Sequence, residues 1–234
     1  HARQVLLTRA SAMDPQIVDR LERFVREGGH ALVTTGFIEA TQDRGIAALT
    51  SIRPTSRKFI ADLYRVEDNS PAGWPSCTYP QAGAPAVLGV AEYRNNFSWG
   101  VIKAVHGEEN IGFLFRDRYG AGELWTIALP DALPDLYRLP APVLSRLREA
   151  FPVRGAWLEG GSLVSLFVYS NDALVLYPYV AEGTQRQVVR LHVAGASALD
   201  LPLRHRTIEP LYTGRRGSET EAVFEMQVIP GQYE

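Results

Sequence analysis

The fold is decided near the start of the chain by the stretch Gln4–Gly36, QVLLTRASAMDPQIVDRLERFVREGGHALVTTG. Both ends of this stretch, Gln4–Thr8 and Ala31–Thr35, are short apolar runs typical of buried strands. Between them, apolar residues recur at the spacing of an amphipathic helix, at Ile17, Val18, Leu21, Phe24 and Val25. This order predicts a β-α-β unit, in which a right-handed crossover joins two parallel strands.

The helix of this unit has recognisable signals at both ends. Asp14 can cap its N-terminus, and Pro15 suits the first helical position, where its missing N–H costs nothing. Gly28 and Gly29 can adopt the left-handed conformation that ends a helix. Because these glycines follow a helix and do not precede one, they do not form a phosphate-binding loop. Two parallel strands do not make a stable sheet, so we expect later strands, an upstream segment or a second subunit to complete it.

Strands dominate the rest of the chain. The stretch Arg57–Val66 fits a strand or a helix, and Pro140–Ala150 has the apolar face of a helix. Further strands are predicted at Ala86–Glu92, Gly100–Val105, Ile111–Arg116 and Glu123–Leu129, and beyond residue 152 at Gly155–Glu159, Leu163–Tyr169, Ala173–Tyr179, Gln187–Val193 and Ala222–Val228. The predicted fold is therefore α/β plus all-β. A partial Rossmann-like mixed sheet occupies residues 1–151, and a small antiparallel β-sandwich occupies residues 152–234.

Composition excludes several classes of function. The 234 residues suffice for one large domain or two small ones, at ~150 residues per domain. A net charge of −2 argues against a nucleic-acid or membrane-surface partner, which would need a basic excess. No run of ~18 apolar residues is present, so we expect no membrane span. The chain starts at His1 and not at Met, and we expect it to be processed or part of a longer protein.

Chemical motifs are scarce. The single cysteine, Cys77, excludes an internal disulfide and lacks the setting of a nucleophile. The five histidines show no metal-ligand spacing, so neither a metal nor a cofactor is expected. On the predicted strand Gln187–Val193, His192 points opposite Leu191, outward or toward a polar partner.

Two segments carry a family resemblance. Leu21–Phe37, LERFVREGGHALVTTGF, resembles the β-α-β edge of class I glutamine amidotransferase-like domains, including the trimerisation domain of some bacterial β-galactosidases. Tyr119–Ile127, YGAGELWTI, is similar to a later strand of those domains. The resemblance covers residues 4–37 and, more loosely, 86–150. Since no cysteine matches the catalytic one of the amidotransferases, it implies a non-catalytic, oligomerising version. The C-terminal sandwich resembles accessory modules of glycoside hydrolases.

One surface has the residue types that sugar recognition uses. Aromatic rings stack on the C–H groups of a sugar, while amides and carboxylates bind its hydroxyls. The candidate substrate-binding residues are Asn96, Trp99, Asp131, Asp135, Tyr137 and Trp74. The competing interpretation gives Trp99 and Tyr137 a packing role and makes Asp131 a helix cap.

Two functions follow from these observations. The first is a non-catalytic structural and interaction part of a larger, carbohydrate-processing protein, which predicts that Trp99 and Tyr137 are buried. The alternative is a glycosidase-type hydrolase with an acid pair between the two domains, drawn from residues such as Asp131, Asp135 or Glu159. In either case a carbohydrate is an expected ligand, and an extracellular or periplasmic location is favoured.

Overall fold

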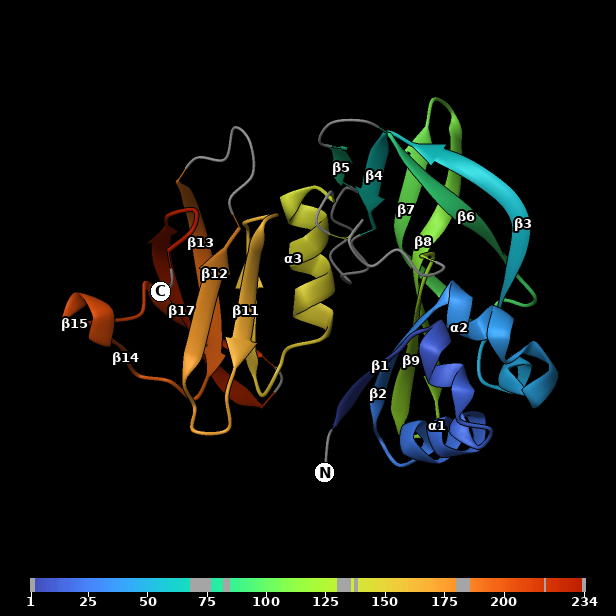
Figure 1. Cartoon of the computed structure of the whole chain (residues 1–234), viewed down its shortest axis with the longest axis horizontal. Coiled ribbons are helices and arrows are strands. Elements are labelled where there is room, and N and C mark those ends of the chain that lie inside the picture. Colours follow the sequence, from blue (N-terminus) through green and yellow to red (C-terminus); the bar gives the residue numbers. More distant parts are fainter. Residues whose placement is uncertain are drawn as a thin grey trace. The chain divides into compact units, whose positions relative to one another are not determined.

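The computed structural model describes residues 3–67, 77–81, 85–129, 136, 139–179, 186–216 and 218–232 (Figure 1). Internal contacts divide the chain into two compact units, His1–Pro140 and Ala141–Glu234. Helix α3 (Ala141–Ala150) belongs to the second unit because it contacts strand β10 (Ala156–Glu159), whereas the sequence analysis placed it in the first. No helix in the described ranges is long and apolar enough to cross a membrane.

The first unit is built on a mixed seven-stranded sheet. Its parallel part joins β1, β2 and β9, and its antiparallel part continues from β9 through β8, β7 and β4 to β5. This confirms the predicted mixed sheet, in which a meander extends a β-α-β unit. The strands, in spatial order, are β1 (Gln4–Leu7), β2 (His30–Thr34), β9 (Gly122–Ile127), β8 (Glu109–Tyr119), β7 (Trp99–His106), β4 (Leu63–Val66) and β5 (Cys77–Pro80).

Helix α1 (Ile17–Arg26) covers one face of this sheet and buries Val18, Leu21 and Val25, as its apolar stripe predicts. The predicted cap is wrong, because a 3-10 turn, η1 (Arg9–Met13), runs up to Asp14 and Gln16 takes the capping position. Asp14 instead accepts a hydrogen bond from the Gln16 amide at 2.9 Å. The helix ends as expected, with Gly28 in the left-handed region at a φ of 97°.

A short helix and a two-stranded ribbon follow β2. Helix α2 (Thr35–Ala40) starts directly at the end of β2, and two 3-10 turns, η2 (Gln42–Arg44) and η3 (Ile46–Ala48), lead from it to the ribbon. The ribbon pairs β3 (Ile52–Ala61) with β6 (Ala86–Tyr93) in antiparallel register. The stretch that fitted either strand or helix therefore forms the end of β3 and the whole of β4.

The second unit is almost entirely antiparallel, as the sequence predicts. One sheet has the order β10, β13 (Gln187–Ala194), β17 (Glu219–Val228) and β16 (Tyr212–Arg216), and a hairpin pairs β11 (Val164–Val168) with β12 (Leu174–Pro178). A second small pair joins β14 (Leu199–Leu201) to β15 (Arg206–Ile208) through the turn η5 (Pro202–Arg204). Side chains from the sheet and the hairpin share one apolar core, which includes Leu158, Val164, Leu176, Val189, Leu191 and Val228. This is the layering expected of a β-sandwich.

Candidate functional site

The structure describes only part of the predicted sugar-binding surface. Asn96 and Trp99 lie at the turn between β6 and β7, and both are exposed. Trp74, Asp131, Asp135 and Tyr137 lie outside the described residues. The burial of Trp99 that the non-catalytic interpretation predicted is wrong, since the residue is 59% exposed.

The register of the sheet shows which face Trp99 lies on. Trp99 pairs with Arg116, which pairs with Trp125, so these three side chains share a sheet face. Leu124 lies on the opposite face by strand alternation, together with Gly122, whose Cβ position lies beside the Val25 carbonyl of α1. The start of β7 therefore receives no cover from α1.

A buried carboxylate holds this turn in place. Asp117 on β8 accepts hydrogen bonds from the Ser98 hydroxyl, from the Thr50 hydroxyl at 2.9 Å and from the Ser51 amide at 3.4 Å. Burial raises the pKa of Asp117, and these hydrogen bonds only partly offset the increase. Asp117 therefore anchors the segments that position Asn96, and it is too enclosed to serve as a ligand-binding acid itself.

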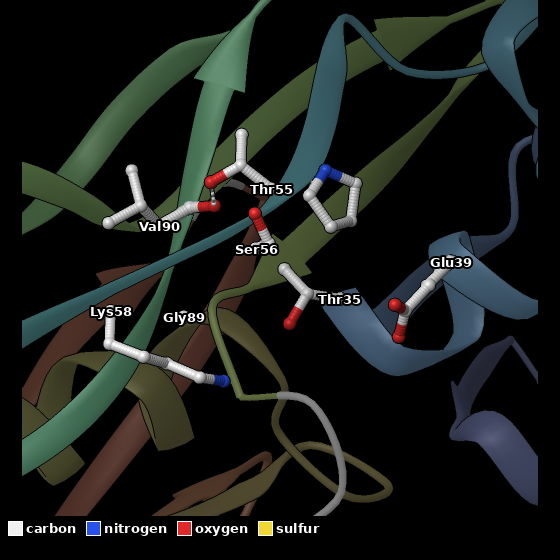
Figure 2. A pocket seen from close by; sticks show the side chains of 8 residues that line it. Thr35, Glu39, Thr55, Ser56, Lys58, Gly89 and Val90 are labelled. Carbon is white, nitrogen blue, oxygen red and sulfur yellow. Dashed lines mark hydrogen bonds between the residues drawn. The ribbon is translucent and has the colours of Figure 1, made fainter.

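A pocket of about 280 Å³ opens in the first unit between α2 and the ribbon of β3 and β6 (Figure 2). Its position follows a general rule, because ligands of open α/β sheets bind where parallel strands end at their carboxyl ends. Helix α2 begins at this end of β2. The pocket is lined by Thr35, Glu39, Pro54, Thr55, Ser56, Lys58, Gly89 and Val90.

An irregularity in β3 shapes one wall of the pocket. The pairing between β3 and β6 shifts register between Pro54 and Lys58, as in a β-bulge. Proline has no N–H to donate to the ladder, which favours such an interruption. The Thr55 hydroxyl fills the gap by donating to the Val90 carbonyl at 2.8 Å and accepting from the Arg57 amide at 3.3 Å. The bulge thus places Ser56 and Lys58 along the pocket.

Thr35 supplies the buried polar group of the pocket. Its side chain is 4% exposed, and its hydroxyl has no hydrogen-bond partner in the described part of the chain. The reason is local, because Thr35 is the first residue of α2 and has no preceding helical turn whose carbonyl it could reach. The neighbouring Thr34 is satisfied, since its hydroxyl oxygen accepts from the Phe37 amide at 3.1 Å.

The charges around the pocket are not equivalent. Glu39 forms an ion pair with Arg9 at 3.0 Å, and both side chains are about half exposed. Lys58 forms no ion pair among the described residues. Glu39 is the single carboxylate among the eight lining residues, so the pocket itself holds no acid pair.

This pocket was not among the sites predicted from the sequence. The usable signal was the end of the strand Ala31–Thr35, because the carboxyl ends of parallel strands are where such folds bind ligands. The sequence did not indicate that Lys58 lies near the end of this strand, because the stretch around Lys58 fitted either a strand or a helix.

A second polar cluster lies in the second unit around His192. The ring is 5% exposed and stacks on Trp157 with ring centroids 3.7 Å apart. Its Nδ1 lies 3.0 Å from a Glu221 oxygen, and its Nε2 lies 3.1 Å from a Glu159 oxygen. Carboxylates only accept, so a histidine satisfies both contacts at once as an imidazolium. The predicted polar partner of His192 is therefore a pair of glutamates.

This cluster does not have the electrostatics of a glycosidase acid pair. Burial raises the pKa of Glu221, but hydrogen bonds from His192 and Trp157 and the nearby charges of His192 and Arg216 outweigh it, so the pKa is lowered. A general acid needs the opposite shift. Glu159 is also paired with Arg190 at 3.4 Å. In the described ranges, no group of three or more His, Cys, Asp or Glu side chains is arranged so that it could hold a metal ion.

Neither a protein-family model nor a curated protein matches the chain in sequence. Solved structures similar to it include a β-galactosidase from Bacillus circulans sp. alkalophilus, at 14% identity and a TM-score of 0.45, covering 97% of this chain and 31% of that one. A GH42 β-galactosidase from G. stearothermophilus matches at 13% identity and 0.39, covering 97% and 30%. A β-galactosidase from Rahnella sp. R3 matches at 11% identity and 0.39, covering 97% and 31%. The chain thus spans less than a third of each of these proteins.

Proposed function

We propose that the chain is a non-catalytic structural and interaction part of a larger, carbohydrate-processing protein. Its first unit would be an amidotransferase-like domain without the nucleophile, since Cys77 lies on the exposed strand β5 and not at a turn between a strand and a helix. The observation that carries the proposal is the open parallel edge of the main sheet at β1. The expected role in carbohydrate processing comes from the sequence resemblance, and such a role favours an extracellular or periplasmic location.

The backbone of β1 offers hydrogen-bonding groups to another strand. The His30 amide donates to the Arg3 carbonyl at 3.0 Å, so Arg3 faces β2. Alternate residues of a strand direct their backbone groups to the same side, which turns those of Gln4 and Leu6 away from β2. No described strand pairs with this outer edge. A strand of an upstream segment or of a second subunit would extend the sheet there.

The alternative function, a glycosidase-type hydrolase, has less support. Of its three candidate acids, Asp131 and Asp135 lie outside the described residues, and the carboxylate of Glu159 is already paired with His192 and Arg190. No observation on the described residues therefore favours an acid pair.

A substrate screen tests the non-catalytic assignment. The purified chain is incubated with chromogenic glycosides and esters, and no turnover is expected. Turnover that Asp131→Ala or Glu159→Gln abolishes would establish the hydrolase instead.

Substitutions at Leu6 test whether the β1 edge pairs with a second subunit. Leu6→Pro removes an outward N–H of β1, whereas Leu6→Thr keeps it and changes only the side chain. Sedimentation velocity over a range of concentrations should show association for the original chain and for Leu6→Thr, and a monomer for Leu6→Pro. Equal association of both variants would show that the β1 edge is not the contact.

A further inference from the structure

The pocket between α2 and the ribbon contains a group that the proposed function does not use. The hydroxyl of Thr35 is buried and unpaired there, although buried polar groups in folded proteins nearly always have a partner. In Figure 2 this hydroxyl and the ammonium group of Lys58 point to the same side of the pocket. A ligand that reached both groups would complete the hydrogen bonding of Thr35.

The charge of the pocket selects an anionic group. Arg9 already neutralises Glu39, so the lysine at position 58 leaves the pocket with a net positive charge. Lysine binds carboxylates and phosphates as a point charge, and these contacts are stronger than hydrogen bonds between neutral groups. The complementary ligand therefore carries a carboxylate or a phosphate.

The other lining groups and the volume of the pocket indicate which kind of anionic ligand fits. The hydroxyls of Thr35 and Ser56 can each donate and accept, as the hydroxyls of a sugar do. Pro54 and Val90 add a small apolar wall for C–H groups. A volume of about 280 Å³ lies just below the range of roughly 300–1,000 Å³ for small-molecule sites, and a bare phosphate ion would leave most of it empty.

We propose that this pocket binds a sugar acid the size of a single hexose. Its carboxylate would pair with Lys58, and one of its hydroxyls would bind Thr35. The site does not depend on pairing at the β1 edge, because it lies on other elements. Loss of sugar-acid binding would therefore leave association through β1 unaffected, and loss of association would leave binding unaffected.

Isothermal titration calorimetry with galacturonate, galactose and inorganic phosphate tests the ligand class. Galacturonate should bind saturably, and galactose, which lacks the carboxylate, should bind at least about tenfold more weakly. Equal affinity for galactose would overturn the role of charge. Tighter binding of phosphate than of galacturonate would overturn the assignment to a sugar acid, as would no galacturonate binding at millimolar concentration.

Two variants test the residues. Lys58→Gln should weaken galacturonate at least about tenfold and leave the weaker affinity for galactose unchanged. Thr35→Val keeps the shape of the side chain, removes an unpaired hydroxyl, and should weaken both ligands without unfolding the protein.

The chain supplies a matched control for each variant. Lys103→Gln changes the other lysine, which pairs with Glu67 at 3.1 Å outside the pocket. Thr126→Val removes a second buried hydroxyl without a partner, on β9. Both controls should bind galacturonate as the original chain does. An equal loss of galacturonate affinity in a control and in its matched variant would refute the proposed site.

Discussion

Among the described glycines of the first unit, Gly122 has the closest backbone neighbours, and it lies where β9 begins beside the end of α1. A Cβ placed on Gly122 would lie 2.2 Å from the Gly29 carbonyl oxygen and 2.3 Å from that of Val25. Both contacts are with backbone, so no side chain can rotate away. To move from 2.2 Å to the 3.0 Å that a methyl carbon tolerates, the start of β9 must shift by about 0.8 Å.

The cost of Gly122→Ala can be worked out from these contacts. Inserting a methyl group into a packed region typically costs about 1–3 kcal/mol. The shift also disturbs the hydrogen bond from the Glu123 amide to the Gly29 carbonyl, now 3.2 Å long and worth about 0.5–1.5 kcal/mol. The expected loss in free energy of unfolding is therefore about 2–4 kcal/mol, or a fall in Tm of roughly 5–15 °C.

Urea unfolding with linear extrapolation measures this loss. Gly89→Ala is the matched control, because Gly89 also lies in a strand of the first unit and its Cβ would meet nothing within 4 Å. The control should differ from the original chain by less than about 0.5 kcal/mol. If Gly122→Ala were as stable as Gly89→Ala, the tight contact between α1 and β9 would be absent. The predicted destabilisation would then be refuted.

Two further predictions concern pH and rest on the buried carboxylate of Asp117 and the half-buried carboxylate of Glu221. The pKa of Asp117 is raised in the folded protein, so Asp117 stabilises the fold at low pH. This stabilisation is lost as pH rises above the ordinary aspartate range. Asp117→Asn should abolish that part of the pH dependence in urea midpoints measured across the acid range. Glu221 shows the opposite sign, since its pKa is lowered, so stability is lost as pH falls below the ordinary glutamate range. Glu221→Gln should remove this loss and cost about 1–3 kcal/mol at neutral pH, and an unchanged acid profile would contradict the assignment.

Local patterns in the sequence predicted much of the fold. The amphipathic helix and its glycine stop, the alternating strands of the second unit, and the mixed character of the first sheet all follow from which residues are buried along a short segment. Such periodicity is a property of a few neighbouring residues. The misplaced cap at Asp14 shows the limit of this reasoning, since a 3-10 turn and a capping turn use the same residue types.

The candidate site required contacts that no local pattern contains. His192 was expected to point outward or toward a polar partner, but it is buried, and the two glutamates that contact it come from β10 and β17, distant in the sequence. Thr35 and Lys58 line the same pocket only because β3 bulges beside α2.

The sequence by itself therefore determined α1, α3 and most of the strands, because burial along each segment sets the period of its apolar residues. Beyond the parallel pair of β1 and β2, only the tertiary structure decided which strands pair. It placed β9 beside β2 and paired β3 with β6, which brought Thr35 and Lys58 to one pocket. The physical reason is that pairing and packing depend on how well distant surfaces fit, which the order of residues in one segment does not contain.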